Sequence, residues 1–416
     1  MLEQTVKHQA HPSANPLRNL NFFKLLSYRV CMVFSYQIMA VVVGWHLYSL
    51  THDPLALGLV GLAEIIPYFC SALFAGYAVD HYSKRNFAIL SSLVLMLSSL
   101  TLAAVASEMI TKYPTLVIYA SIGLVGLGRA FIAPSYSSIF AIILPRKEYG
   151  KASGIGSSAF QIGLVTGPAL GGVLVGWTSV TIAYLVAASF ALMSALPLVM
   201  LNISHQTTKP EKAVFAGIAE AVKFVVNHQV ILSAQALDMF AVLLGGAVAM
   251  LPAFIHDIYQ VGPEGLGILR SSPAIGAIMT GIYLARNPIR EHAGKYLLWA
   301  VAGFGVCIIG FGLTSHFWVA ALILVLSGIF DGVSVILRTT IMQLSTPDHM
   351  RGRVASINGI FIGSSNELGA FESGVTAKLF GLVPSVVLGG LMTLGVVATT
   401  AKLTPKLRNL DLNHLE

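Results

Sequence analysis

Seven ionisable side chains stand out inside long apolar stretches of this sequence, where a charge is costly. They are Glu64, Arg129, Asp238, Asp331, Arg338, Glu367 and Glu372. Charged groups inside apolar spans are usually functional, because an unpaired charge in hydrocarbon is strongly destabilising. A carboxyl group removed from water can take up and release a proton near neutral pH. The pattern therefore indicates proton binding, ion pairing or contact with a polar substrate.

Five of these residues are candidates for proton coupling, namely Glu64, Arg129, Asp238, Asp331 and Glu367. No apolar stretch holds more than two of the seven charges, so we expect pairing between helices. Asp331 and Arg338 are seven residues apart, which places them on one helix face about 10 Å apart along the axis. Arg338 and Glu372 are predicted to form interhelical ion pairs, and Asp238 or Asp331 could instead serve the substrate.

The composition identifies the elements that must position these groups. The chain has 416 residues, of which 56% are hydrophobic and only 10% charged, with a mean hydropathy of +0.78. A soluble protein of this size carries about 25% charged residues, and a disordered chain is poor in apolar residues. Only helices or a closed barrel can span a bilayer. The apolar runs are continuous rather than alternating, so the sequence predicts an all-α membrane protein.

Twelve apolar runs are long enough to cross a membrane. They cover residues 25–50, 56–79, 86–108, 115–143, 151–175, 178–201, 229–256, 264–286, 295–314, 317–344, 353–380 and 384–404. The polar stretch 202–228 separates them into two groups of six, and its mildly amphipathic part, 213–226, is predicted to lie on the membrane surface. We therefore expect an N-terminal six-helix bundle (1–201), a cytoplasmic linker (202–228) and a C-terminal six-helix bundle (229–416).

Most of the 25 Lys and Arg residues fall in alternate connections, on the side of the chain termini. Positive residues favour the cytoplasmic side, so both termini are predicted to be cytoplasmic. The net charge of +7 is thus explained by membrane topology and not by nucleic-acid binding. The polar first 20 residues do not resemble a cleavable signal peptide.

The two halves repeat. A pattern of Pro, four residues, Gly and a basic residue begins at Pro145 and again at Pro347, and Pro67 and Pro273 each lie 13 residues before a charged residue. The two matches fall at nearly the same offset, which indicates a parallel duplication of six helices. Parallel repeats related by an axis along the membrane normal are a transporter architecture, with the substrate site between the halves.

The connection after the second run contains Gly76, Asp80, Lys84 and Arg85 at a characteristic spacing. This pattern resembles the signature of the major facilitator superfamily: Gly, three residues, Asp, a basic residue, any residue, Gly and two basic residues. His81 and Ser83 depart from it. The resemblance implies an intracellular gate that includes Asp80 and is made and broken during transport.

The fifth run carries small residues at fixed spacing: Gly154, Gly163, Gly167, Pro168, Gly171 and Gly172. Small residues let membrane helices pack closely, and proline is tolerated where neighbouring helices satisfy the freed carbonyl. The full spacing resembles the antiporter motif of exporters within the superfamily. The resemblance therefore implies outward transport coupled to protons.

Further stretches resemble one bacterial branch of the superfamily, the drug and siderophore exporters, including those of enterobactin type. They are Gly44-Trp45, Tyr48–Thr51, Gly128–Phe131 with Pro134, Leu237-Asp238, Leu251-Pro252, Thr346–Arg353, Ser365–Gly369 and Glu372–Gly374. The resemblance to this superfamily implies that the first, fourth, seventh and tenth helices line the central cavity. The substrate-cavity candidates are therefore Gln37, Arg129, Asp238, Asp331 and Arg338, whereas Tyr36 is expected to pack. Arg129 resembles the fourth-helix arginine that is associated with proton transfer.

The sequence contains neither a phosphate-binding loop nor a zinc-protease or serine-hydrolase signature, so we expect no enzyme, no cofactor and no metal. The best interpretation is a monomeric exporter in a bacterial inner membrane that exchanges a drug-like or siderophore-like compound for protons. An importer or passive facilitator is an alternative that the fifth-run motif disfavours. A receptor or scaffold without transport is another, disfavoured because it has no need for costly buried charges.

Overall fold

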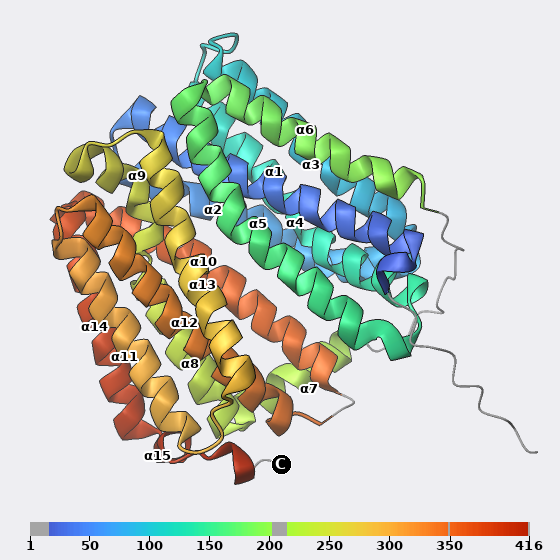
Figure 1. Ribbon diagram of the computed structural model, residues 1–416, viewed down its shortest axis with the longest axis vertical. Coiled ribbons are helices and arrows are strands. Elements are labelled where there is room, and N and C mark those ends of the chain that lie inside the picture. The colour runs from blue at the N-terminus through green and yellow to red at the C-terminus, as the bar shows by residue number, and fades with distance from the viewer. Residues whose placement is uncertain (1–15, 202–213, 348–349, 415–416) are drawn as a thin grey trace, which may run out of the picture.

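The computed structural model describes residues 16–201, 214–347 and 350–414, and within them it is built from helices (Figure 1). The helices of the first half are α1 (Leu20–Thr51), α2 (Pro54–His81), α3 (Lys84–Ala106), α4 (Pro114–Ile143), α5 (Tyr149–Trp177) and α6 (Val180–Val199). Those that follow are α7 (Val214–Asn227), α8 (Gln229–Leu244), α9 (Leu251–Ala253), α10 (Pro263–Arg286), α11 (Ala293–Leu313), α12 (Phe317–Ser345), α13 (Arg351–Phe380), α14 (Leu382–Leu403) and α15 (Pro405–Arg408).

Local chemistry sets where these helices begin. The side chains of Asn19, Asp53, Ser83 and Ser179 accept hydrogen bonds from backbone N–H groups of the first helical turn. Such caps satisfy donors that have no partner within the helix. The helices α2, α4 and α10 begin with proline, which has no N–H to leave unpaired.

The long helices form two bundles of six, with α1–α6 in one and α8–α14 in the other (Figure 1). Equivalent helices pack alike, since α2 lies on α4 as α10 lies on α12, and α3 lies on α6 as α11 lies on α14. Glycines permit these close approaches: a side chain at Gly126 would strike the backbone of α2, and one at Gly328 would strike that of α10. The predicted pair of pseudo-symmetric bundles is confirmed.

The bundles meet at one end of the molecule, which we call the closed end. It carries the connections at 52–53, 178–179, 260–262 and residue 381. There α2 packs on α13 and α5 packs on α10. A Cβ atom placed on Gly58 would lie 2.9 Å from the Cα of Gly374, and one on Gly172 would lie 2.9 Å from the Cα of Gly267. The two backbones of each seam are therefore in direct contact.

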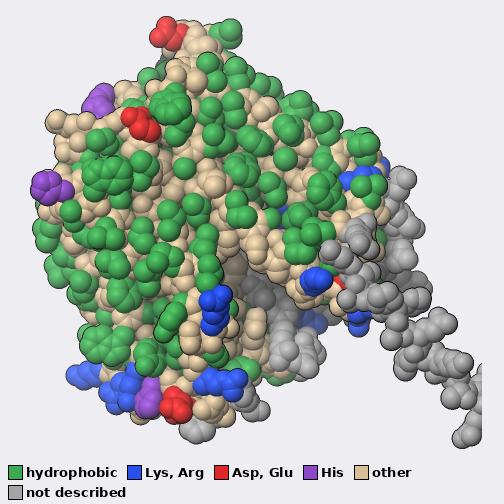
Figure 2. Space-filling model, in the orientation of Figure 1, with side chains coloured by type: hydrophobic (Ala, Val, Ile, Leu, Met, Phe, Trp, Pro, Cys, Tyr) green, Lys and Arg blue, Asp and Glu red, His purple; other side chains and the backbone are tan. Residues whose placement is uncertain are grey.

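The same four helices separate toward the other end. A Cβ atom added at Gly76, Gly150, Gly281 or Gly359 would have no neighbour within 4 Å in the described structure. The surface is hollowed between the bundles there (Figure 2). This end carries exposed basic residues such as Arg146, Lys147 and Arg290, so we call it the basic end.

Two predicted spans differ from expectation. The seventh, predicted as continuous over 229–256, is broken: α8 ends at Leu244, the glycines 245–246 follow, and a 3-10 turn η3 (Ala247–Met250), α9 and a π-helical turn η4 (Phe254–Tyr259) complete the crossing. Hydropathy alone does not register this break, because glycine is nearly neutral on such scales and loses more entropy than other residues in a helix.

The eleventh span forms α13, 30 residues long, but α13 is not among the eleven helices of the described chain that are apolar enough to qualify as membrane spans. Its polar residues include Asn366, Glu367 and Glu372. The helix α13 packs on α2 and α8, and of these three residues Glu367 and Glu372 are partly buried whereas Asn366 is exposed. The linker helix expected at 213–226 is present as α7, and residues 202–213 lie outside the described part of the chain.

Candidate functional site

A charged cluster from both bundles lies between them. Arg129 of α4 forms an ion pair with Glu64 of α2, and its Nη1 donates a hydrogen bond to the Tyr36 hydroxyl at 2.7 Å. The same hydroxyl is 3.3 Å from Glu64 Oε1. The Arg129 guanidinium also stacks 4.2 Å from the centre of the Tyr36 ring. One cation on α4 thus holds a carboxylate of α2 and a phenol of α1.

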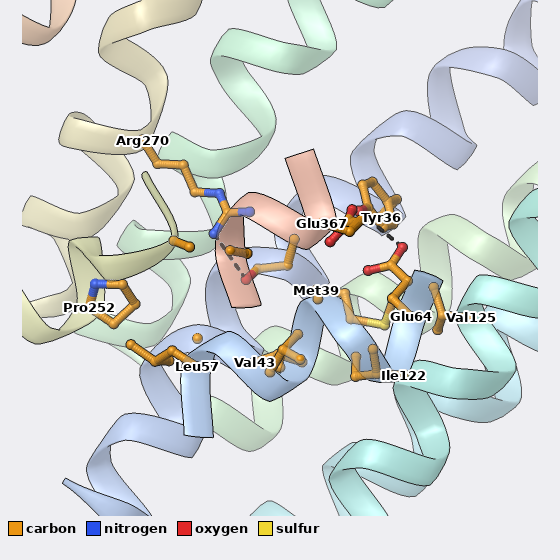
Figure 3. A pocket seen from close by; sticks show the side chains of 16 residues that line it. Tyr36, Met39, Val43, Leu57, Glu64, Ile122, Val125, Pro252, Arg270 and Glu367 are labelled. Carbon is orange, nitrogen blue, oxygen red and sulfur yellow. Dashed lines mark hydrogen bonds between the residues drawn. The ribbon is translucent and has the colours of Figure 1, made fainter. Parts of the chain in front are cut away.

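The second bundle contributes Glu367 and Arg270 to this cluster. Glu367 Oε1 of α13 is 3.7 Å from Arg129 Nη1, and the Arg270 side chain of α10 donates to the carbonyl of Ala40 at 3.4 Å. Glu64, Glu367, Arg270 and Tyr36 all line one cavity of about 110 Å³ (Figure 3). That volume holds several water molecules. The cavity lies on the closed-end side, beside Leu57 and Pro252.

The cluster balances two cations, Arg129 and Arg270, against two carboxylates, Glu64 and Glu367. Arg129 lies between the carboxylates of the two bundles, and its side chain is 31% exposed, whereas that of Glu64 is only 8% exposed. A proton on either carboxyl would remove one negative charge and leave the cations in excess. The arrangement can therefore couple protonation to the contact between the bundles.

A second ion pair lies within the C-terminal bundle. Asp238 Oδ2 of α8 is 2.5 Å from Arg338 Nη1 of α12, and both side chains are buried. Asp331 lies close enough to influence both electrostatically. The Arg338 Nε and the Ser334 hydroxyl are buried without a hydrogen-bond partner in the described structure. Arg338 therefore makes the interhelical pair that the sequence predicts. The described chain shows no ion pair for Glu372.

The small residues of α5 face two neighbours. A Cβ atom at Gly167 would lie 2.7 Å from the Cβ of Gln37, and Gly163 and Gly171 meet Val33 and Ile38 of the same helix, α1. Their four-residue spacing forms one stripe along α5.

The other motif positions lie elsewhere. Gly172 and the carbonyl of Pro168 approach Gly267 of α10, whereas Gly154 faces open space. Close packing thus involves five of the six motif residues.

The residues of the predicted gate lie at the basic end. A Cβ atom added at Gly76 would have no neighbour within 4 Å among the described residues, and Arg85 donates to the carbonyl of Leu201 in its own bundle at 3.1 Å. Lys84 begins α3. The side chain of Asp80 lies outside the described part of the chain.

The structure brings together only some of the candidates. Glu64, Arg129 and Glu367 meet in one cluster, and Asp238, Asp331 and Arg338 gather in another. Gln37 packs against Gly167 and is absent from the residues lining the 110 Å³ cavity, as are the three residues of the second cluster.

Two residues of the first cluster, Tyr36 and Arg270, were not predicted from the sequence as functional. Tyr36 was expected to pack, but its hydroxyl bonds both charges of the pair. Arg270 lies within an apolar run, so the rule that singled out the other charges would also have found it.

Two pseudo-symmetric six-helix bundles with buried charges at their interface define a membrane transport protein. The chain belongs to the Major Facilitator Superfamily, whose family model matches residues 25–370. The chain is therefore a multi-pass membrane transporter rather than an enzyme by fold and family.

Similar proteins cover most of its length. The multidrug efflux pump Tap of Mycolicibacterium fortuitum is 25% identical over 390 residues, which are 90% of this chain and 93% of Tap. The enterobactin exporter EntS of Salmonella typhi is 23% identical over 88% of this chain and 90% of EntS.

Solved structures agree on the fold. A bacterial homologue of the human lysosomal transporter Spinster, in an inward-facing and unoccupied conformation, superimposes with a TM-score of 0.76 at 15% identity and covers 95% of this chain and 99% of its own. A D-xylose–proton symporter gives a TM-score of 0.71 at 14% identity, over 95% of this chain and all of the symporter.

Proposed function

We propose that this protein exports a small drug-like or siderophore-like compound in exchange for protons, through alternating access of the inter-bundle site. The main support for this proposal is the Glu64–Arg129–Glu367 cluster, in which one arginine contacts carboxylates of both bundles. A scaffold would have no need of such a group inside its apolar interior.

The direction of transport rests on two further observations. The fifth helix carries the small-residue motif typical of exporters, and its glycines form the seams with α1 and α10. The similar proteins Tap and EntS are named as an efflux pump and an exporter. An exporter must accept its substrate from inside the cell.

The conformation, which is open at the basic end, is compatible with acceptance of a substrate from inside the cell. With the basic end in the cytoplasm of a bacterial inner membrane, as the positive-inside rule favours, both termini are cytoplasmic and the open hollow faces the cell interior. The closed end then blocks the outer side. In the outward-open state, protonation of Glu64 or Glu367 from outside would weaken the hold of Arg129 on one carboxylate and bias the two bundles toward a different contact.

Reconstituted protein would test this proposal. Liposomes with inverted protein and an imposed pH gradient, acidic inside, should accumulate a transported compound from a panel of drugs and catecholate chelators. Collapse of the gradient with an ionophore should abolish the accumulation. Accumulation that persists without a gradient, or uptake only in the opposite direction, would contradict proton-coupled export and favour a facilitator or an importer.

A further inference from the structure

Two adjoining cavities form a groove on the C-terminal bundle, between α10, α11 and α12. The larger has a volume of about 480 Å³ and a mostly apolar wall that includes Tyr283, Trp299 and Phe330. The smaller, of about 190 Å³, shares Leu284 and Ile289 with the larger. The two cavities therefore make one continuous surface feature, which we call the lateral groove.

The lateral groove faces the membrane and not the space between the bundles. Trp299 is 75% exposed, and Tyr283 is 65% exposed, although both lie within apolar helices. Aromatic side chains of this kind prefer the region near the lipid headgroups. None of the residues that line the 110 Å³ cavity lines the lateral groove.

The basic-end rim of the lateral groove is positively charged. Arg290 lines the smaller cavity, and Arg286 and Lys295 are exposed at the adjoining ends of α10 and α11. The described part of the chain shows no ion pair for any of these three. The connection also contains Glu291, so its Lys, Arg and Glu side chains carry a net positive charge.

The dimensions match one lipid molecule in one leaflet. The groove follows α12 from Ile329 to Leu344, which is about 22 Å of helix at 1.5 Å per residue. Half of a bilayer's hydrocarbon core is about 15 Å thick. The remaining length lies beside the basic rim, at the depth of a headgroup.

We propose that the lateral groove binds an anionic phospholipid of the leaflet at the basic end. An acyl chain lies along the apolar wall beside Trp299, and the headgroup phosphate binds Arg290 and Lys295. Basic side chains without acidic partners select an anionic lipid over a zwitterionic one. This site is independent of the direction in which the transporter moves its substrate.

Tryptophan fluorescence can test the site directly. The chain has four tryptophans, and Trp45, Trp177 and Trp318 lie toward the closed end. A W45F/W177F/W318F protein keeps Trp299 as its one reporter. We expect brominated phosphatidylglycerol to quench Trp299 more strongly than brominated phosphatidylcholine at the same low mole fraction.

Matched charge variants separate this site from general surface charge. R290Q/K295Q should lower the preference for phosphatidylglycerol by about fivefold per removed charge, corresponding to about 1 kcal/mol each. R146Q/K147Q removes one arginine and one lysine at the same end of the other bundle and should leave the preference intact.

Equal quenching by the two lipids, or a preference that survives R290Q/K295Q, would overturn the proposal. Displacement of both lipids alike by the neutral dye Nile red would also overturn it, because the groove would then admit apolar compounds in general.

Discussion

At the scale of single residues, the charges inside this protein divide into two kinds of pair. Asp238 and Arg338 lie within one bundle and are almost sealed from solvent. Arg129 instead contacts Glu64 of its own bundle and Glu367 of the other. Only the second arrangement links the two bundles, so we propose that transport coupling involves the Arg129 cluster and that the Asp238–Arg338 pair is structural.

The Glu64→Gln variant should separate coupling from binding. A glutamine keeps the shape and a hydrogen-bond acceptor for Tyr36 but cannot take up a proton. We expect substrate exchange at equal pH on both sides to continue, while uphill transport driven by a pH gradient falls to passive equilibration. Asp238→Asn is the comparison, because that pair lies away from the cavity. If both variants retain full gradient-driven transport, the coupling proton binds elsewhere, with Asp331 and Glu367 next to be examined.

Breaking the buried Asp238–Arg338 ion pair should lower the free energy of unfolding. Arg338→Met leaves the Asp238 carboxylate buried without its partner, which typically costs about 3–5 kcal/mol. The double variant Asp238→Leu/Arg338→Met removes both charges and should recover most of that loss. Thermal unfolding in detergent, followed by the Tm of each variant, measures the difference. A double variant as unstable as the single one would argue that the pair holds a wider polar network together.

At the scale of helices, the glycine stripe of α5 brings α5 and α1 close together. Gly167→Leu places a branched side chain where even a Cβ atom would lie 2.7 Å from Gln37. We expect this variant to insert into the membrane but to lose transport. Gly154→Leu is a matched control, because Gly154 belongs to the same motif and faces open space. Equal transport by the two variants would show that α5 and α1 can move apart at this position without loss of transport.

Sequence patterns predicted the helices well because hydropathy and length report directly on burial in a bilayer. They did not predict the break at 245–246, since glycine leaves the hydropathy of the run unchanged. The sequence also did not predict the ion-pair partners of Glu64 and Asp238. Pairing depends on which helices are neighbours, and Arg129 and Arg338 are 65 and 100 residues away from these acids along the chain. The sequence did not predict that Tyr36 belongs to the charged cluster, because an aromatic residue in a membrane helix is ordinary.

At the scale of the whole molecule, the closed end joins the bundles through polar contacts as well as backbone seams. Lys378 Nζ of α13 is 2.7 Å from Asp53 Oδ2, at the start of α2. The Tyr48 hydroxyl of α1 donates to Asp257 Oδ2 of η4 at 2.5 Å. Both contacts cross from one bundle to the other. They must break if the closed end is to open, so each adds to the stability of the present conformation.

Lys378→Gln should therefore shift the protein toward opening at the closed end. Exposed ion pairs contribute about 0.2–1 kcal/mol, so the ratio of open to closed forms should rise by at most about fivefold. Spin labels on Thr178 and Ser315, in a background without Cys31, Cys70 and Cys307, would report the distance between the bundles there. An unchanged distance distribution would show that the Lys378–Asp53 contact does not help to hold this end closed.

A sufficiently low pH should weaken the same contact, the ion pair between Lys378 and Asp53. Partial burial opposes ionisation of Asp53, but the hydrogen bonds from Lys378 and from the Leu55 N–H outweigh it and lower the pKa of Asp53 below its usual 3.8. A lowered pKa means that the contact is at full strength above pH 3.8 and is lost only as the pH falls through the lower value of the closed form. The distance between the labels should thus stay constant from neutral pH down to about that of the free carboxyl, and lengthen only below it. Opening that begins well above pH 3.8 would instead show that a group other than Asp53 carries the response.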